Sequence, residues 1–163
     1  FITRVGAINF SENEHCCSEA AVLANVVSGD AAILLVAPVN LVGGDMVGLQ
    51  WSLIGNASEE LHGIQVGGIN WTRGDTVGFQ AGFVNISDTD GYNDTRGAQL
   101  GTVNWSAGDF GGLQISFINV GARDVNGMQI GLLNYAGDLD GVQLGVININ
   151  GDGFDVPIIN IGE

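Results

Sequence analysis

Polar amides recur in one fixed phase between short apolar runs along most of this chain. Every glutamine lies two residues after a glycine and two before a glycine or serine, and successive glutamines are 14, 15 or 19 residues apart. The unit reads G-x-Q-x-G-x-x-N, and apolar residues flank the glutamine and, in most units, precede the asparagine. This pattern predicts a strand, a corner that glycine permits, and a second strand whose inward side is offset. The glutamines are Gln50, Gln65, Gln80, Gln99, Gln114, Gln129 and Gln143.

The asparagine of the unit extends the phase beyond these glutamines. Asn160 closes a last unit with Asp155 in the glutamine position, and Asn40, Asn25 and Asn9 continue the phase backward. A coil of about 15 residues buries its apolar side only by stacking on the next coil, at about 4.8 Å. Stacking places like amides above one another, where they hydrogen-bond as ladders. We therefore predict an all-β fold, a β-solenoid (β-helix) of about eleven coils in which the seven glutamines form a ladder.

An antiparallel meander is the rival interpretation, since Asp-Gly turns also join antiparallel strands. In a meander alternate strands reverse, so glutamines would not stack on glutamines. Their constant phase would then have no physical reason.

The chain is predicted to form a single solenoid domain over 1–163, with regular repeats over 48–163 and degenerate repeats or a cap over 11–47. Residues 1–10 read as a strand. Ser11 and Glu14 have capping-box spacing, which favours a short helix over 11–25, and a degenerate coil is the alternative. If this segment is helical, the strand 1–10 is free to be exchanged between subunits.

The repeats resemble those of bacterial surface-repeat proteins with GLQIGLxN-type units, best seen in Gly127-Met128-Gln129-Ile130-Gly131-Leu132-Leu133-Asn134. The resemblance covers roughly 48–148 and concerns architecture. It implies an extracellular or cell-surface location and brings no catalytic residues.

Charge excludes two classes of partner. The chain has 18 acidic residues, four arginines and a net charge of −14, so we expect no binding to nucleic acid or to anionic lipid headgroups. Without an uninterrupted apolar window of 18 residues, we also expect no membrane span.

Two sets of residues are candidates for ligands or modification. Asp88, Asp90 and Asp94 lie in the one long interval and are possible calcium ligands, a solvated turn being the alternative; no other cofactor is expected. Six N-x-S/T triplets predict glycosylation of outward asparagines, unless the hydroxyl residue only serves the repeat. These are Asn9, Asn56, Asn70, Asn85, Asn93 and Asn104.

No nucleophile with a base converges on a pocket in this pattern, so we expect no enzyme. The ends keep apolar strands without a polar cap, which favours head-to-tail contacts between copies of the chain. The sequence thus predicts a non-enzymatic, extracellular structural protein that assembles end to end into a filament or surface layer. A monomeric surface adhesin or carbohydrate-binding module, with surface glycans as partners, is the alternative.

Overall fold

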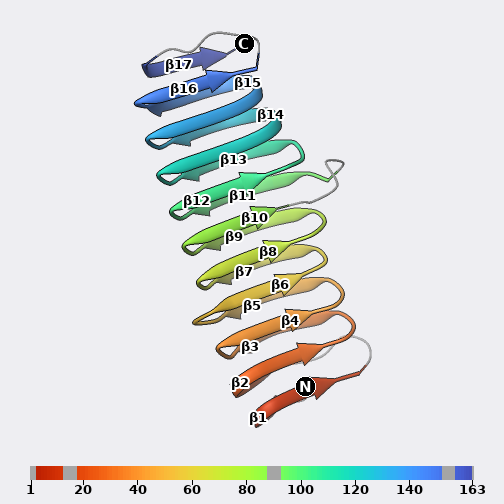
Figure 1. The fold of residues 1–163 in the computed structure, drawn as a ribbon. Coiled ribbons are helices and arrows are strands. Elements are labelled where there is room, and N and C mark those ends of the chain that lie inside the picture. Colours follow the sequence, from red (N-terminus) through yellow and green to blue (C-terminus); the bar gives the residue numbers. More distant parts are fainter. Residues whose placement is uncertain (1–2, 13–17, 88–92, 152–156, 163) are drawn as a thin grey trace.

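The computed structural model is an elongated stack of strands with the N-terminus at one end and the C-terminus at the other (Figure 1). It describes residues 3–12, 18–87, 93–151 and 157–162. These residues are all-β and contain no helix, so none of them forms a helix able to cross a membrane.

Two flat sides face each other across a narrow interior. We name them the Gln side and the Asn side after the amide that each points inward. The Gln side contains β3 (Ala31–Val36), β5 (Met46–Trp51), β7 (Leu61–Val66), β9 (Thr76–Ala81), β11 (Thr95–Leu100) and β13 (Phe110–Ile115). The Asn side contains β4 (Val39–Val42), β6 (Gly55–Ser58), β8 (Ile69–Thr72), β10 (Val84–Ser87), β12 (Val103–Ser106) and β16 (Ile147–Asn150).

Four longer strands bend from one side to the other, and one short strand ends the chain. The bending strands are β1 (Thr3–Ser11), β2 (Ser18–Val27), β14 (Ile118–Ile130) and β15 (Leu133–Gly145), and the last strand is β17 (Ile158–Gly162).

Equivalent strands of successive coils pair in parallel and in register. Gln65 lies opposite Gln80, and Asn70 lies opposite Asn85. This register confirms the β-solenoid and rules out a meander. The solenoid has about nine turns, because ten stacked asparagines define nine steps, and not the eleven units predicted from the sequence.

One unit of this difference comes from the C-terminal end, and the other comes from counting the steps between the ten asparagines. The strand β17 reverses and pairs antiparallel with β15, which places Asn160 opposite Gln143. Asn160 therefore belongs to the glutamine column, and its assignment as the asparagine of a last coil was wrong. Asp155, the expected glutamine equivalent, lies outside the described residues.

The N-terminal helix is also absent from the part that is described. Residues 18–25 belong to β2, which pairs in parallel with β1 and β4. Asn9 and Asn25 are stacked, as the degenerate-coil alternative requires. Since β1 is paired within its own chain, the strand exchange that depended on the helix has no basis here.

A column of glycines with positive φ runs up the Gln side. The glycine two residues before each glutamine has φ between 132° and 154°. At Gly78 an added Cβ would overlap the carbonyl oxygen of Gly63 in the coil below, so the column requires glycine for both backbone conformation and space. Ile33 occupies the equivalent position in β3 with φ 88°, a strained conformation for a β-branched residue.

The interior is largely polar, and its apolar parts lie toward the two ends. One buried apolar cluster contains Leu35, Met46 and Leu61, and another contains Phe110, Val125 and Leu139. Between them the interior carries hydroxyls, such as those of Thr72 and Ser87, which bond to glutamines. The apolar residues that flank each glutamine and asparagine point outward.

Candidate interaction surfaces

The asparagine ladder is the continuous internal support of the solenoid. It runs from Asn9 to Asn148, and each Nδ2 donates to the Oδ1 of the next asparagine toward the C-terminus at 2.8–3.0 Å. Most of these nitrogens also donate to a backbone carbonyl of the next coil, as Asn70 does to Ala81 at 2.8 Å. The amides are thus satisfied although they are buried.

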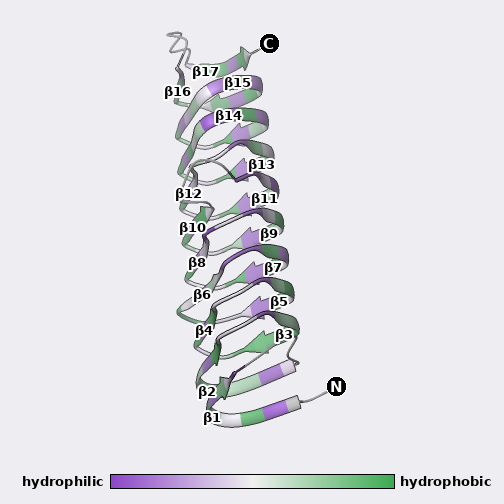
Figure 2. Cartoon of the chain, turned by 90° about the vertical axis from the view of Figure 1, so that its right-hand side faces the viewer, coloured by the Kyte–Doolittle hydropathy of each residue, from purple (hydrophilic) through white to green (hydrophobic). Residues whose placement is uncertain are grey.

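The glutamine ladder forms as predicted and has the opposite direction. From Gln65 onward, each glutamine Nε2 donates to the Oε1 of the preceding glutamine, at 2.6–3.0 Å. Asn160 extends the column at the C-terminal end by donating to Gln143 at 3.0 Å. In Figure 2 the hydrophilic band of this column recurs on β5, β7, β9, β11 and β13 and is missing from β3.

From Gln50 toward the N-terminal end, the same column continues with Leu35, Glu19 and Arg4. Glu19 is buried, and the Arg4 guanidinium lies 3.9 Å from its Oε1. Burial raises the pKa of Glu19, an effect that the positive charge of Arg4 partly offsets. The first coils therefore hold a titratable group where later coils hold a neutral amide.

Five of the six glycosylation candidates belong to the asparagine ladder. Asn9, Asn56, Asn70, Asn85 and Asn104 are at most 7% exposed, and their nitrogens donate inside the solenoid. In the folded chain these five asparagines point inward, so the prediction that they are glycosylation sites was wrong. Asn93 lies outside the ladder, in the turn before β11, and stays a prediction.

The predicted calcium ligands are not assembled by the described residues. Asp88 and Asp90 lie outside them, and Asp94 accepts a hydrogen bond from Arg96 at 2.8 Å. The described part of the chain contains no cluster of three or more histidine, cysteine or acidic side chains fit to hold a metal.

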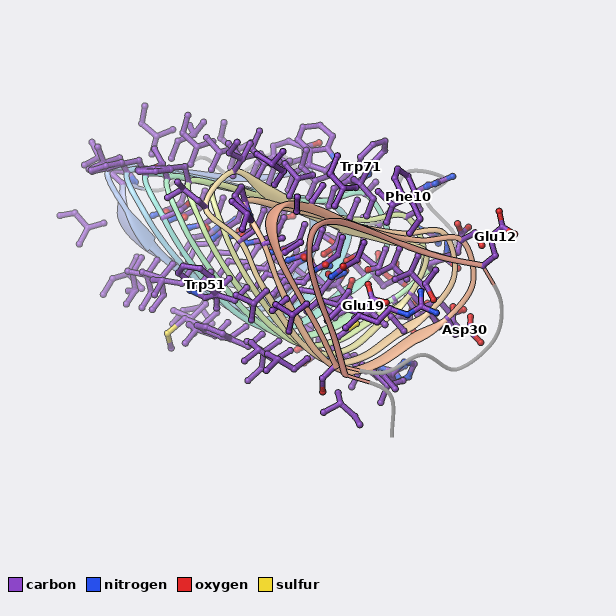
Figure 3. All side chains as sticks on the ribbon, turned by 90° about the horizontal axis from the view of Figure 1, so that it is seen from below. Phe10, Glu12, Glu19, Asp30, Trp51 and Trp71 are labelled. Carbon is purple, nitrogen blue, oxygen red and sulfur yellow. The ribbon has the colours of Figure 1, made fainter. Side chains whose placement is uncertain are left out.

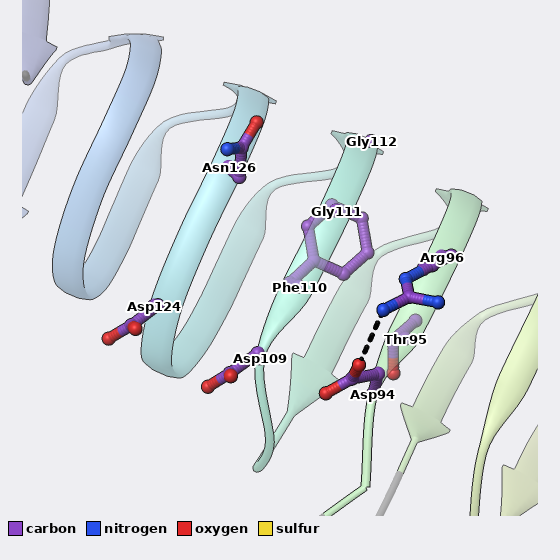
Figure 4. A pocket seen from close by; sticks show the side chains of 9 residues that line it. All are labelled: Asp94, Thr95, Arg96, Asp109, Phe110, Gly111, Gly112, Asp124 and Asn126. Carbon is purple, nitrogen blue, oxygen red and sulfur yellow. Dashed lines mark hydrogen bonds and ion pairs between the residues drawn. The ribbon is translucent and has the colours of Figure 1, made fainter.

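An open hollow lies over Gly111 and Gly112 (Figure 4). Because glycine has no side chain, these two residues leave space between neighbouring coils. Of the carboxylates beside it, Asp94 pairs with Arg96 and Asp109 pairs with Arg123. Thr95, the hydroxyl residue of its lining, is buried and accepts a hydrogen bond from Ser106. These lining residues supply no activated nucleophile.

Charge is concentrated on one long edge, where the chain passes from the Asn side to the next strand of the Gln side. We call it the acidic edge, and Glu12 and Asp30 mark it in Figure 3. Along it Asp30 accepts a backbone hydrogen bond from Asp45, and Asp75 accepts one from Asp94. Among the described residues, its acidic members are Glu12, Asp30, Asp45, Glu59, Glu60, Asp75, Asp94, Asp109, Asp124 and Asp138.

The opposite edge, which we call the apolar corner, exposes large hydrophobic residues. Phe83 is 74% exposed there, beside Leu53, Phe117, Leu132 and Val146. Sequence reasoning predicted this corner as a turn but missed its character. The signal was present, because the residues between the second glycine and the asparagine are mostly apolar.

Both flat sides are apolar on the outside as well. Trp51 lies on the outer surface of the Gln side and Trp71 on that of the Asn side, and Figure 3 shows them on opposite sides of the stack. The outward residues of β8, β10 and β12 are Ile69, Trp71, Val84, Ile86, Val103 and Trp105. Sequence reasoning missed this too, since alternation shows which residues share a side and not which side is inside.

The two ends of the stack differ. Among the described strands β1 pairs only with β2, so its other edge is open. At the C-terminal end β17 covers the part of β15 on the Gln side, and its own outer edge has no partner strand within the described residues.

The chain was also compared with known proteins. It matches no protein family model, no curated protein and no solved structure.

Proposed function

We propose that this chain is a non-enzymatic structural protein of the extracellular space or cell surface, in which copies assemble end to end through strand pairing. The observation that carries the proposal is the edge of β1 that no other described strand pairs with. This strand is nine residues long and continues both sides of the solenoid. An unpaired edge of this length is a template for another strand.

The other end offers a partner edge of matching composition. Ile158, Ile159 and Ile161 of β17 are exposed, as are Val5, Ile8 and Phe10 of β1. Pairing of β1 with the C-terminal strands of the next copy joins two different surfaces. Such a heterologous contact does not close on itself, and it generates a filament.

The resemblance of the repeats to bacterial surface-repeat proteins supports the location, and the internal ladders support the structural role. Each added coil contributes backbone pairing and two amide bonds, so the same interactions that stack coils within a chain also serve to stack chains.

The test compares two lysine substitutions of similarly exposed valines. Val5 lies in β1 at the open edge and is 81% exposed, and Val22 lies one coil further and is 73% exposed. Val5→Lys places a charge on the open edge, which opposes pairing, and Val22→Lys is the matched control. Negative-stain microscopy in a mild detergent should show rods that lengthen with concentration for the wild type and Val22→Lys, and single-copy particles for Val5→Lys.

Wild-type particles of single-copy length at every concentration would contradict the proposal. They would favour the monomeric binding module instead.

A further inference from the structure

The outer surface of the solenoid separates charge from apolar area. Away from the acidic edge, the charged side chains of the described residues are Arg4 and Glu19 in the first coils and Arg96 and Asp140 next to the edge. The Asn side, the apolar corner and most of the Gln side form one continuous apolar surface around the molecule. Each side is about 45 Å long and about 13–20 Å wide, which exceeds the few hundred Å² that monomers usually expose.

We propose that this surface contacts lipid acyl chains. The solenoid lies with its long axis in the plane of a bilayer, the apolar corner inserts into one leaflet, and the acidic edge stays in water. A strand of six residues spans about 20 Å, and the hydrocarbon of one leaflet is about 15 Å thick. The distance from the acidic edge to the corner therefore fits one leaflet with the edge outside it.

The positions of the aromatic residues agree with this orientation. Trp71 and Trp105 lie near the ends of β8 and β12, next to the acidic edge, and the Arg73 guanidinium lies 5.9 Å from the Trp71 ring centroid. Tryptophan with a nearby cation is typical of the level of the headgroups. Trp51 ends β5 next to the apolar corner, so it should lie deeper in the leaflet.

Lipid explains the surface better than a second copy does. A copy seated on one side leaves the other two apolar sides in water, whereas a leaflet covers all three. The outward residues also change in size from coil to coil, from Ala57 to Trp71 to Ile86. Fluid acyl chains adapt to such a surface, while a packed interface needs fitting shapes.

Depth-dependent quenching tests the proposal with phosphatidylcholine vesicles. One variant keeps only Trp51 (Trp71→Phe and Trp105→Phe), and another keeps only Trp71 (Trp51→Phe and Trp105→Phe). The protein should float with the vesicles. Bromine near the ends of the acyl chains should quench Trp51 more strongly, and bromine near the headgroups should quench Trp71 more strongly.

A pair of corner variants tests which surface makes the contact. Phe83→Asp with Phe117→Asp should weaken vesicle binding about ten-fold or more, because two exposed aromatic anchors are lost. Phe83→Leu with Phe117→Leu is the matched control and should bind as the wild type does. Rod growth in detergent should be the same for both, which separates this contact from end-to-end assembly.

Binding to vesicles that contain the anionic lipid phosphatidylglycerol is measured as a further test. The acidic edge should weaken binding to them at low salt, and added salt should restore it. Protein that does not float, or tryptophans that no bromine quenches, would overturn the proposal. Lateral oligomers that form in place of vesicle binding would also overturn it and would identify a second copy as the occupant.

Discussion

The first coils and the regular coils after them share the asparagine column and differ in the glutamine column. Asparagine is unbroken from Asn9 to Asn148, whereas the other column holds Arg4, Glu19 and Leu35 before its first glutamine. In the middle of the solenoid the second hydrogen bonds of the two amides differ, although Gln50, Gln129 and Gln143 donate to backbone carbonyls as the asparagines do. Asn104 donates to the backbone carbonyl of Ile115, but Gln99 donates to the hydroxyl of Ser87.

Replacement of the two amides therefore has different consequences. Without the asparagine, a backbone carbonyl at the corner loses one of its two donors, since Ile115 O also accepts from the backbone N–H of Gly101. Without a glutamine in the middle of the column, the groups that lose a partner are side chains, which can be replaced together. Leu35 illustrates this, because it lies in the apolar cluster with Met46 and Leu61.

The largest effect should come from breaking the column that both regions share. Asn104→Leu removes the donor to Asn119 and to the carbonyls of Gln99 and Ile115. It also removes the acceptor of Asn85 Nδ2. Four buried hydrogen bonds are lost at about 1 kcal/mol each, so we expect a loss of about 4 kcal/mol in the free energy of unfolding, measured by chemical denaturation.

Gln99→Leu is the matched comparison for Asn104→Leu. It should cost about half as much, roughly 2 kcal/mol, because the groups it leaves unpaired are side chains. Equal losses for the two variants would refute the distinction between the columns.

A smaller effect of opposite sign is expected in the glycine column of the first coils. Ile33→Gly should stabilise the chain by about 1 kcal/mol, because it relieves a positive φ on a β-branched residue that is half exposed. Thermal unfolding would measure the gain. Gly78→Ala in the regular coils should have the reverse effect, and a gain there would contradict the role assigned to the column.

The last effect is of similar size and concerns Glu19, the pKa of which is raised by burial. The folded chain binds this proton more tightly than the unfolded chain, so the contribution of Glu19 to stability is fully present below its ordinary pKa of 4.5 and is lost as pH rises through the raised value. Glu19→Gln should therefore stabilise the chain at pH 7 by roughly 1 kcal/mol. The gain should shrink toward pH 4, as measured by melting temperature across pH, and a gain independent of pH would disprove the explanation.

The sequence was sufficient to predict the solenoid and the glutamine ladder, because only parallel stacking accounts for amides in one phase. It also contained the asparagine column as far as Asn9. The composition of the other column in the first coils was not predictable, since Leu35 and Glu19 have neither the shape nor the hydrogen bonds of glutamine.

The inward position of the asparagines and the reversal at β17 were the features that sequence reasoning got wrong. A hydroxyl residue two positions after asparagine fits a glycosylation site, and it fits equally a buried neighbour such as Thr72, which hydrogen-bonds to Gln65 and Gln80. Asn160 fits both amide columns, because either one alternates with apolar residues. Local pattern cannot separate such cases when the decisive contact lies across the interior or in the neighbouring coil.

The opposite directions of the two ladders have a consequence for length. The amide dipoles of the asparagine column and those of the glutamine column point to opposite ends of the molecule, so they largely cancel in each turn that carries both amides. Adding or deleting a whole repeat then changes the number of turns without building up opposite partial charges at the tips. Variation in repeat number should thus be tolerated electrostatically, whatever length a given chain has.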